Sequence, residues 1–346
     1  MDGVDLPVLP PVDPMLARAA DTVPAEPGVW SYEPKWDGFR TLVFRDGDQV
    51  VLQSRSGKEL GRYFPELLDA LRAGVAPRCV LDGEVVVPRQ IGGRTRLDWE
   101  SLSQRIHPAA SRVAMLAEQT PAHFIGFDAL ATGSASLLAE PFRARRDALS
   151  ELVTEQRQCH VTRVTADPGL ATRWLTTFEG AGLDGVVAKR LAGTYLPGKR
   201  DMVKVKHHRD ADCVAMGYRI HKSGKGIGSI LLGLYRDDGG LAMVGGAASF
   251  TAADRLKLLA ELEPLRLGDD VVYDGEPSRW NSAADKHWNP IRPERVAEVA
   301  YDQMEGLRFR HTVKFLRWRP DRDPASCTFD QLDLPLKYDL SDVLES

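Results

Sequence analysis

The chain has 346 residues, 43% apolar and 27% charged, with a formal net charge of −4, which is typical of a folded globular protein and, at this length, of two domains. No run approaches the roughly 18–20 apolar residues of a membrane span, and the start MDGVDLPVLPPVDPM lacks the basic and apolar parts of a secretory signal. The four cysteines show no CxxC spacing, which argues against a zinc site or a disulfide scaffold, so we expect a cytosolic protein.

The first 206 residues alternate strand-like apolar runs with amphipathic helices. The predicted strands are 28–35, 39–45, 49–55, 79–87, 123–130, 183–190 and 202–208. The predicted helices are 62–74, 97–106, 142–156 and 168–182. The DGD between the second and third strands predicts a hairpin. Hairpins mixed with helices indicate an α+β domain over residues 1–206 with a largely antiparallel sheet.

The character of the chain changes at the polar stretch HHRDAD, residues 207–212, which we interpret as a hinge. Predicted strands follow at 212–222, 229–236, 241–249, 270–274, 296–304 and 307–319, with one helix at 251–265. Roughly five strands and one helix in about 120 residues are typical of a small β-barrel, and an OB-fold is the natural candidate. We therefore predict an OB-fold domain over residues 207–346 that ends in an acidic tail.

Positive charge is concentrated in two parts of the chain despite the negative total. Residues 185–230 contain ten Lys or Arg against three Asp or Glu, and a second basic run covers 306–322. A local positive stripe is what binding to a phosphate backbone needs, although a solvated protein face can look the same.

An ordered series of short motifs carries the strongest functional signal. KWDG at 35–38 is weak by itself, because a surface lysine before an Asp-Gly turn is common. It is followed by SRSG at 54–57, LDGE with Glu84, FD with Phe127, DGVVAK at 184–189, and KVK at 204–206. RPDR at 319–322 ends the series in the second predicted domain.

This series resembles the covalent nucleotidyltransferases, most closely the small two-domain bacterial ATP-dependent DNA ligases with a LigC-like layout. The resemblance covers about residues 30–325. It implies an antiparallel-sheet nucleotidyltransferase (ATP-grasp-like) domain followed by the OB-fold. It also implies that ATP donates AMP to a lysine, that the AMP passes to a 5′-phosphate at a nick, and that the 3′-hydroxyl then expels it. Lys35 is the implied nucleophile.

A lysine needs help to act as a nucleophile. An unperturbed amine has a pKa of about 10.4, so near pH 7.5 only about 0.1% is uncharged, a handicap of about 4 kcal/mol. Burial and neighbouring cations favour the neutral form. We expect Lys204, Lys206 and a bound metal ion to provide those cations, and a strand to aim Lys35 into a pocket.

The resemblance assigns nucleotide contacts to five further residues. Glu33 would meet the adenine amino group, and Phe127 would stack on adenine unless it is simply a core residue. Arg40 and Arg55 would contact the sugar and later the nick phosphate. Glu84 would accept a hydrogen bond from a ribose hydroxyl or face a metal ion; a buried carboxylate without such a partner would be costly.

The remaining assignments concern phosphates and metal. Lys204 and Lys206 would grip the α-phosphate and stabilise charge in the transition state. Arg319 of RPDR would help to orient pyrophosphate. The candidate ligands for Mg²⁺ or Mn²⁺ are Asp184, Glu84 and Asp321.

Two positions depart from the family pattern. Asp184 stands where the family usually has glutamate, so a metal ion would sit closer or a water would bridge the gap. Arg322 stands where the family has lysine. It keeps the charge, but a planar guanidinium is not equivalent to an ammonium group, so the rate of adenylation could change.

The expected partners are nicked double-stranded DNA and repair polymerases or end-binding proteins. We expect the protein to be a monomer in the bacterial cytosol, near the nucleoid. Two rival functions stay open. One is an RNA ligase or a GTP-dependent capping guanylyltransferase, which share KxDG chemistry; Glu33, EPKWDGFR and VAKR favour ATP and DNA. The other is a non-catalytic module that binds nucleic acid through the barrel alone.

Overall fold

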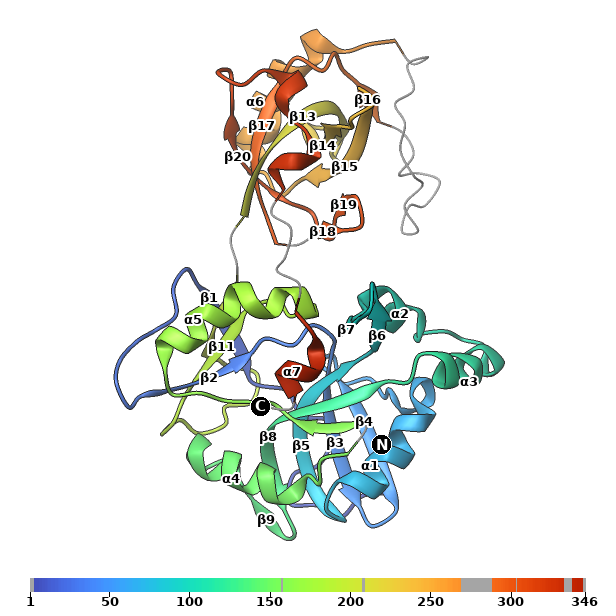
Figure 1. The fold of residues 1–346 in the computed structure, drawn as a ribbon, viewed down its shortest axis with the longest axis vertical. Coiled ribbons are helices and arrows are strands. Elements are labelled where there is room, and N and C mark those ends of the chain that lie inside the picture. Colours follow the sequence, from blue (N-terminus) through green and yellow to red (C-terminus); the bar gives the residue numbers. More distant parts are fainter. Residues whose placement is uncertain are drawn as a thin grey trace. The chain divides into compact units, whose positions relative to one another are not determined.

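The computed structural model describes residues 3–156, 158–206, 209–268, 288–302, 304–332 and 338–344. The chain forms two compact units (Figure 1), one made of residues 1–207 and 335–346 and the other of residues 208–334. No helix within the described ranges is long and apolar enough to cross a membrane.

The first unit contains two main sheets and a small hairpin. The first sheet has the order β1-β12-β11-β2, and the second has β10-β8-β5-β3-β4 with β9 beside β8. The strands are β1 (Leu16–Ala20), β2 (Trp30–Pro34), β3 (Phe39–Asp46), β4 (Gln49–Ser54), β5 (Arg78–Val86), β8 (His123–Thr132), β9 (Ala135–Ser136), β10 (Cys159–Val161), β11 (Val186–Arg190) and β12 (Arg200–Val205), with β6 (Pro88–Ile91) and β7 (Arg94–Leu97) forming the hairpin. Pairing is antiparallel except for β1 with β12 and β10 with β8.

Helices cover these sheets because the strands are apolar on both sides. β8 is buried along nearly its whole length, and α4 packs against it. The helices of this unit are α1 (Pro65–Gly74), α2 (Trp99–Gln104), α3 (Ala110–Gln119), α4 (Phe142–Leu152), α5 (Pro168–Thr177) and α7 (Leu340–Leu344). The predicted mixture of hairpins and helices is confirmed. Helix α3 was not predicted: it has no side-chain cap, and only Val113 and Leu116 of it are buried.

The last described segment, residues 338–344, belongs to the first unit, so the prediction that the acidic tail belongs to the second domain is wrong. Leu340 and Val343 of α7 are buried in a cluster that contains Phe178. The ring centroid of Tyr338 lies 5.5 Å from the ring centroid of Phe178. The charge of the tail suggested solvation, but apolar side chains three residues apart share one face of a helix and can be buried together.

Replacing Val343 with aspartate should therefore lower the free energy of unfolding by about 3 kcal/mol, because it removes an apolar contact and buries an unpaired charge. The urea midpoint measures this loss. Asp342→Asn, on the exposed side of the same helix, is the matched control and should change the midpoint little. Equal midpoints for Val343→Asp and wild type would show that α7 contributes nothing to this core.

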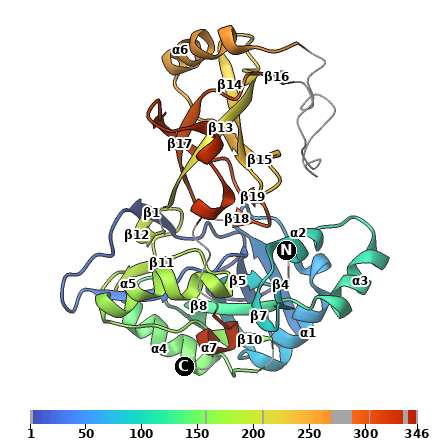
Figure 2. The ribbon, with the colours of Figure 1, turned by 45° about the horizontal axis from the view of Figure 1, so that its top comes forward.

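The second unit is built on a five-strand antiparallel path, β15-β14-β13-β17-β20. Its elements are β13 (Arg209–Ile220), β14 (Ile227–Tyr235), β15 (Leu241–Ala247), α6 (Ala252–Leu262), β16 (Asn289–Pro290), β17 (Val296–Tyr301), β18 (Met304–Glu305), β19 (Arg308–Phe309) and β20 (Lys314–Trp318). A bridge between Ala247 and Val313 links the end of β15 to the residue before β20. Helix α6, capped by Thr251, packs against β14 (Figure 2).

Three predictions for this part of the chain need comment. Residues 209–212 lie in β13, so the prediction that all of 207–212 is a hinge is wrong. The side chains of Arg209 and Ala211 are buried and alternate with the more exposed Asp210 and Asp212, as expected for a strand. The single strand predicted at 307–319 is divided into β19 and β20. The strand predicted at 270–274 lies outside the described residues.

Candidate active site

Lys35 follows directly after β2, at a point where the chain is still paired with its neighbour. Its N–H donates to Gly185 O at 2.8 Å, and Asp184 N–H donates to Lys35 O at 3.0 Å. The prediction that Lys35 lies within a strand is therefore wrong by one residue, because regular pairing ends at Pro34. These two hydrogen bonds bring the motifs KWDG and DGVVAK side by side.

Two glycines permit this close approach. A Cβ on Gly38 would lie 2.1 Å from Val85 O, so the KWDG turn could not pack on β5 with any other residue there. Gly185 has φ of +130°, and a Cβ there would lie 2.2 Å from Val205 O. Both motif glycines are thus required by the contacts of the backbone.

A cavity of about 260 Å³ opens beside Lys35 in the first unit. It is lined by six of the other predicted residues: Glu33, Arg40, Arg55, Glu84, Phe127 and Lys204. Its remaining lining residues are Pro14, Leu16, Ala17, Pro34, Trp36, Val187, Lys189, Arg200 and Met202. Cationic side chains outnumber acidic ones on this wall, which suits a ligand rich in phosphate.

Asp184 connects Lys35 to the lysine motif on β12. Its Oδ2 lies 2.5 Å from Lys35 Nζ and 3.0 Å from Lys206 Nζ. Burial opposes ionisation of Asp184, but the two ammonium groups outweigh burial and hold its pKa below the ordinary value. Desolvation, Lys35 and Lys206 together lower the pKa of Lys204. The structure thus brings Lys35 and Lys206 together around one carboxylate, and the charges of both act on Lys204.

Arg40 is held at the cavity by a carboxylate that we did not predict. Its Nε and Nη2 donate to Asp82 at 2.5 and 2.6 Å, and Tyr195 Oη donates to the same carboxylate at 2.6 Å. Asp82 is fully buried. This bidentate pair fixes the plane of the guanidinium group.

Phe127 lines the cavity but has only 7% of its surface exposed. The guanidinium carbon of Arg40 lies 4.4 Å from the ring centroid, and Lys189 Nζ lies 4.7 Å from it. A base stacked on the face that Arg40 covers would have to displace that guanidinium group. Stacking of adenine on Phe127 stays a prediction.

Glu33 is 2% exposed and lies beside a buried lysine. Lys189 Nζ is 2.9 Å from Glu33 Oε1 and donates to Phe127 O at 2.8 Å. Burial raises the pKa of Glu33, whereas Lys189 acts in the opposite direction. Glu33 Oε1 has no well-aligned hydrogen bond among the described residues, despite the short ion pair, so this oxygen can still accept one from a ligand.

Glu84 on β5 pairs in register with Arg40 on β3. Burial raises the pKa of Glu84 to about 7, although Arg40 and Lys35 act in the opposite direction. Near neutral pH this carboxyl group is therefore divided between its charged and uncharged forms.

Glu84→Gln should raise the free energy of unfolding by about 2 kcal/mol near pH 8 in metal-free buffer. An acid whose pKa is higher in the folded than in the unfolded state destabilises the fold as pH rises through that interval, here from 4.5 to about 7. The gain should therefore shrink as pH falls from about 7 to 4.5 and be absent below. Urea unfolding of both proteins across this range tests it; a gain that did not vary with pH would contradict the assignment.

The acidic residues fit a metal ion only together with a substrate. No group of three His, Cys, Asp or Glu side chains suited to a metal ion occurs in the described ranges. Asp184 contacts Lys35, and Glu84 lines the cavity. Since Mg²⁺ typically takes one or two carboxylates plus phosphate oxygens and waters, this pair suits a cation that binds together with a nucleoside triphosphate.

The other two predicted residues, Arg319 and Asp321, lie in the second unit and contact each other. Arg319 Nη2 is 2.8 Å from Asp321 Oδ2. Asp321 is therefore engaged by an arginine, and its role as a metal ligand stays a prediction.

Three functional candidates escaped prediction, and two of them had a signal in the sequence. Arg200 lies four residues before Lys204, so it shares one face of a strand with that lysine. Lys189 lies two residues after the cavity-lining Val187 on β11. Asp82 had no such signal, because its contact with Tyr195 joins residues 113 positions apart.

Residues 14–206 match the family "ATP dependent DNA ligase domain", and residues 223–322 match "ATP dependent DNA ligase C terminal region". The chain belongs to the ATP-dependent DNA ligases. This ligase is 78% identical over 347 residues to DNA ligase C1 of Mycolicibacterium smegmatis, and the alignment covers 99% of each chain.

A second relative agrees with this, and a solved structure shares the fold. DNA ligase C of Mycobacterium tuberculosis is 52% identical to this ligase over 361 residues, again covering 99% of both chains. A solved structure from work on Lig E DNA ligases has a TM-score of 0.54 and 16% identity, and the match covers 88% of this chain and 99% of that one. That likeness concerns the fold alone. The predicted LigC-like resemblance is confirmed.

Proposed function

We propose that this ligase seals nicks with a 5′-phosphate and a 3′-hydroxyl in duplex DNA, through covalent attachment of AMP to Lys35. The observation that carries the proposal is the position of Lys35 Nζ beside a cavity of about 260 Å³ with a cationic wall. An amine placed among phosphate-binding side chains is the arrangement that nucleophilic attack on a phosphorus atom requires.

In the first step the uncharged amine of Lys35 attacks the α-phosphorus of ATP. A nitrogen–phosphorus bond forms, the bond to pyrophosphate breaks, and the proton that the amine loses passes to solvent. Asp184 holds the amine in place through its 2.5 Å contact. Lys204 and Arg55 offset the negative charge that grows on the phosphate oxygens. Mg²⁺ or Mn²⁺ held by Asp184 and Glu84 would supply further neutralisation of phosphate charge.

In the later steps the chain's residues release AMP and guide the ends of the DNA. An oxygen of the 5′-phosphate attacks the AMP phosphorus, and the bond to Lys35 breaks. The 3′-hydroxyl then attacks the 5′-phosphorus and AMP leaves. Arg40 and Arg55, which line the cavity, are the proposed contacts for the sugar and then for the nick phosphate.

The pair of Glu33 and Lys189 supports ATP over GTP as the donor. Burial raises the pKa of Glu33 and opposes its ionisation, whereas Lys189, 2.9 Å from Glu33 Oε1, acts in the opposite direction. The ionised carboxylate only accepts hydrogen bonds. Adenine offers an amino donor at the position where guanine has a carbonyl acceptor. Glu33 would thus favour adenine over guanine when it is ionised.

We also propose that the second unit is an OB-fold barrel that grips the duplex. The path β15-β14-β13-β17-β20 and the bridge from Ala247 to Val313 support a barrel. The proposal also includes a role in DNA repair, a cytosolic and nucleoid-associated location, and a monomeric state. The proposed protein partners are repair polymerases or end-binding proteins.

Two measurements test the function. Intact mass spectrometry with magnesium and either ATP or GTP should show one added AMP and no added GMP. Labelled nicked duplexes, either all-DNA or with ribonucleotides at the 3′ side, should then be sealed. A protein that accepts only GTP, or seals only nicked RNA, would favour the capping or RNA-ligase alternative. Salt-sensitive DNA binding without any adduct would favour a non-catalytic module.

A further inference from the structure

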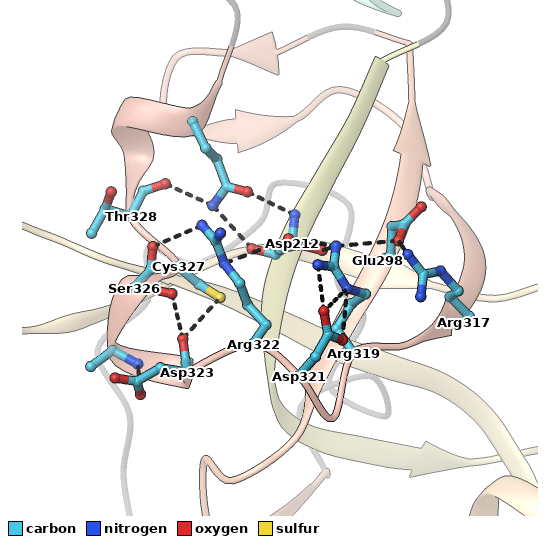
Figure 3. A network of polar contacts seen from close by, with 12 residues as sticks. Asp212, Glu298, Arg317, Arg319, Asp321, Arg322, Asp323, Ser326, Cys327 and Thr328 are labelled. Carbon is cyan, nitrogen blue, oxygen red and sulfur yellow. Dashed lines mark hydrogen bonds and ion pairs between the residues drawn. The ribbon is translucent and has the colours of Figure 1, made fainter.

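Both arginines of the RPDR turn lie beside a single carboxylate of the second unit (Figure 3). Arg319 Nη1 donates to Asp212 Oδ1 and Oδ2 at 3.2 and 3.1 Å. Arg322 Nε lies 3.6 Å from the same Oδ2 in an ion pair. The turn itself is closed by a hydrogen bond from Arg322 N to Arg319 O at 3.2 Å. Asp212 therefore stands between two cations that would otherwise repel each other.

The sheet supplies a second carboxylate on the same face. Asp212 on β13 pairs in register with Glu298 on β17, which pairs in turn with Arg317 on β20. Glu298 Oε2 lies 3.5 Å from Arg319 Nη1 and 2.6 Å from Arg317 Nη2. Two carboxylates directly opposite each other would destabilise the sheet, and the arginines offset that repulsion.

Both backbone polar groups of Asp212 are hydrogen-bonded to the side chain of Gln331. Its N–H donates to Gln331 Oε1 at 2.7 Å, and Gln331 Nε2 donates to Asp212 O at 3.0 Å and to Thr328 O at 2.9 Å. The side chain of Asp212 is 13% exposed, compared with 60% for Asp321, the other acidic partner of Arg319. A sheltered carboxylate on a strand orients an arginine better than an exposed one in a turn, because solvent screens it less.

We propose that Asp212 is a positioning residue for the adenylation step, with Glu298 in support. It holds Arg319 and Arg322 on one side of the turn, so that the two guanidinium groups meet the β- and γ-phosphates of ATP together. Guanidinium groups bind phosphate oxygens through parallel N–H donors, so their relative orientation decides how well they bind. The inference rests on the proposed function and adds a residue that the RPDR motif does not contain.

The test separates adenylation from the later chemistry. Asp212→Asn should raise the KM for ATP in lysyl-AMP formation about tenfold, since misplaced arginines bind the triphosphate less well. Discharge of lysyl-AMP by added pyrophosphate should slow in parallel. Sealing of a nick that already carries AMP should stay near the wild-type rate, because that step involves no pyrophosphate. Asp212→Glu should restore part of the ATP affinity.

Asp210→Asn is the matched control, an exposed residue on the same strand with the same change of charge. It should leave all three rates unchanged. Equal losses in adenylation and in sealing of the adenylated nick, or an unchanged KM for ATP, would overturn the inference. Should Asp212→Asn fail to fold, Glu298→Gln must show a smaller rise in KM of the same kind, and no rise would overturn the inference. If the wild type forms lysyl-AMP yet seals no nick, the proposed function fails while the effect of Asp212 on adenylation remains measurable.

Discussion

Lys35→Arg should form no detectable covalent adduct with AMP and should lose at least about a thousandfold of its ATP-dependent nick sealing. Arginine keeps the positive charge beside Asp184, but its guanidinium group is not deprotonated in proteins and cannot attack phosphorus. The measurement is intact mass spectrometry after incubation with magnesium and ATP, followed by sealing of a labelled nicked duplex.

The same variant provides its own internal control. A nick that already carries AMP needs no nucleophilic lysine, so Lys35→Arg should seal it within about tenfold of the wild-type rate. Lys58→Arg, an exposed lysine that does not line the cavity, should behave as wild type in every assay. An adduct on Lys35→Arg would place the nucleophile elsewhere and would defeat the proposed mechanism.

Asp184→Asn should slow lysyl-AMP formation by about a hundredfold or more. In the wild type, one oxygen of Asp184 lies 2.5 Å from Lys35 Nζ and 3.0 Å from Lys206 Nζ. A neutral amide cannot hold two ammonium groups, so both amines would lose their orientation. Single-turnover kinetics with labelled ATP would measure the loss directly.

Asp184→Glu tests the departure from the family pattern at this position. Glutamate restores the usual family residue and the charge, so adenylation should remain within about tenfold of wild type. If Asp184→Asn and Asp184→Glu were equally impaired, the step would need both the charge and the shorter side chain of aspartate. If Asp184→Asn were fully active, the contact between Asp184 and Lys35 would have no role in catalysis.

Much of the candidate site follows from sequence because its residues sit in short, ordered motifs. Strand alternation places Glu33, Phe127 and Lys204 on the faces from which they reach the cavity. The two motif glycines similarly indicate backbone positions where no side chain fits, as the contacts of Gly38 and Gly185 show. These are local properties, and local spacing is sufficient to predict them.

The partners of these residues could not be predicted, because they come from distant parts of the chain. Asp82 meets Arg40 across neighbouring strands and Tyr195 across 113 positions. Asp212 meets Arg319 across 107 positions, and the sequence placed it at the boundary between the predicted hinge and the strand predicted from residue 212. The sequence of a short polar stretch does not indicate which cation each of its acidic residues will contact.

The sequence by itself therefore determined the alternation of strands and helices and most of the side chains that line the cavity beside Lys35, since these depend on spacing along a few residues. Only the tertiary structure decided which carboxylate holds which cation, and that α7 at the acidic end of the chain is buried in the first unit. The reason is physical: burial and charge pairing depend on distances through space, and those distances arise only when sheets and helices pack together.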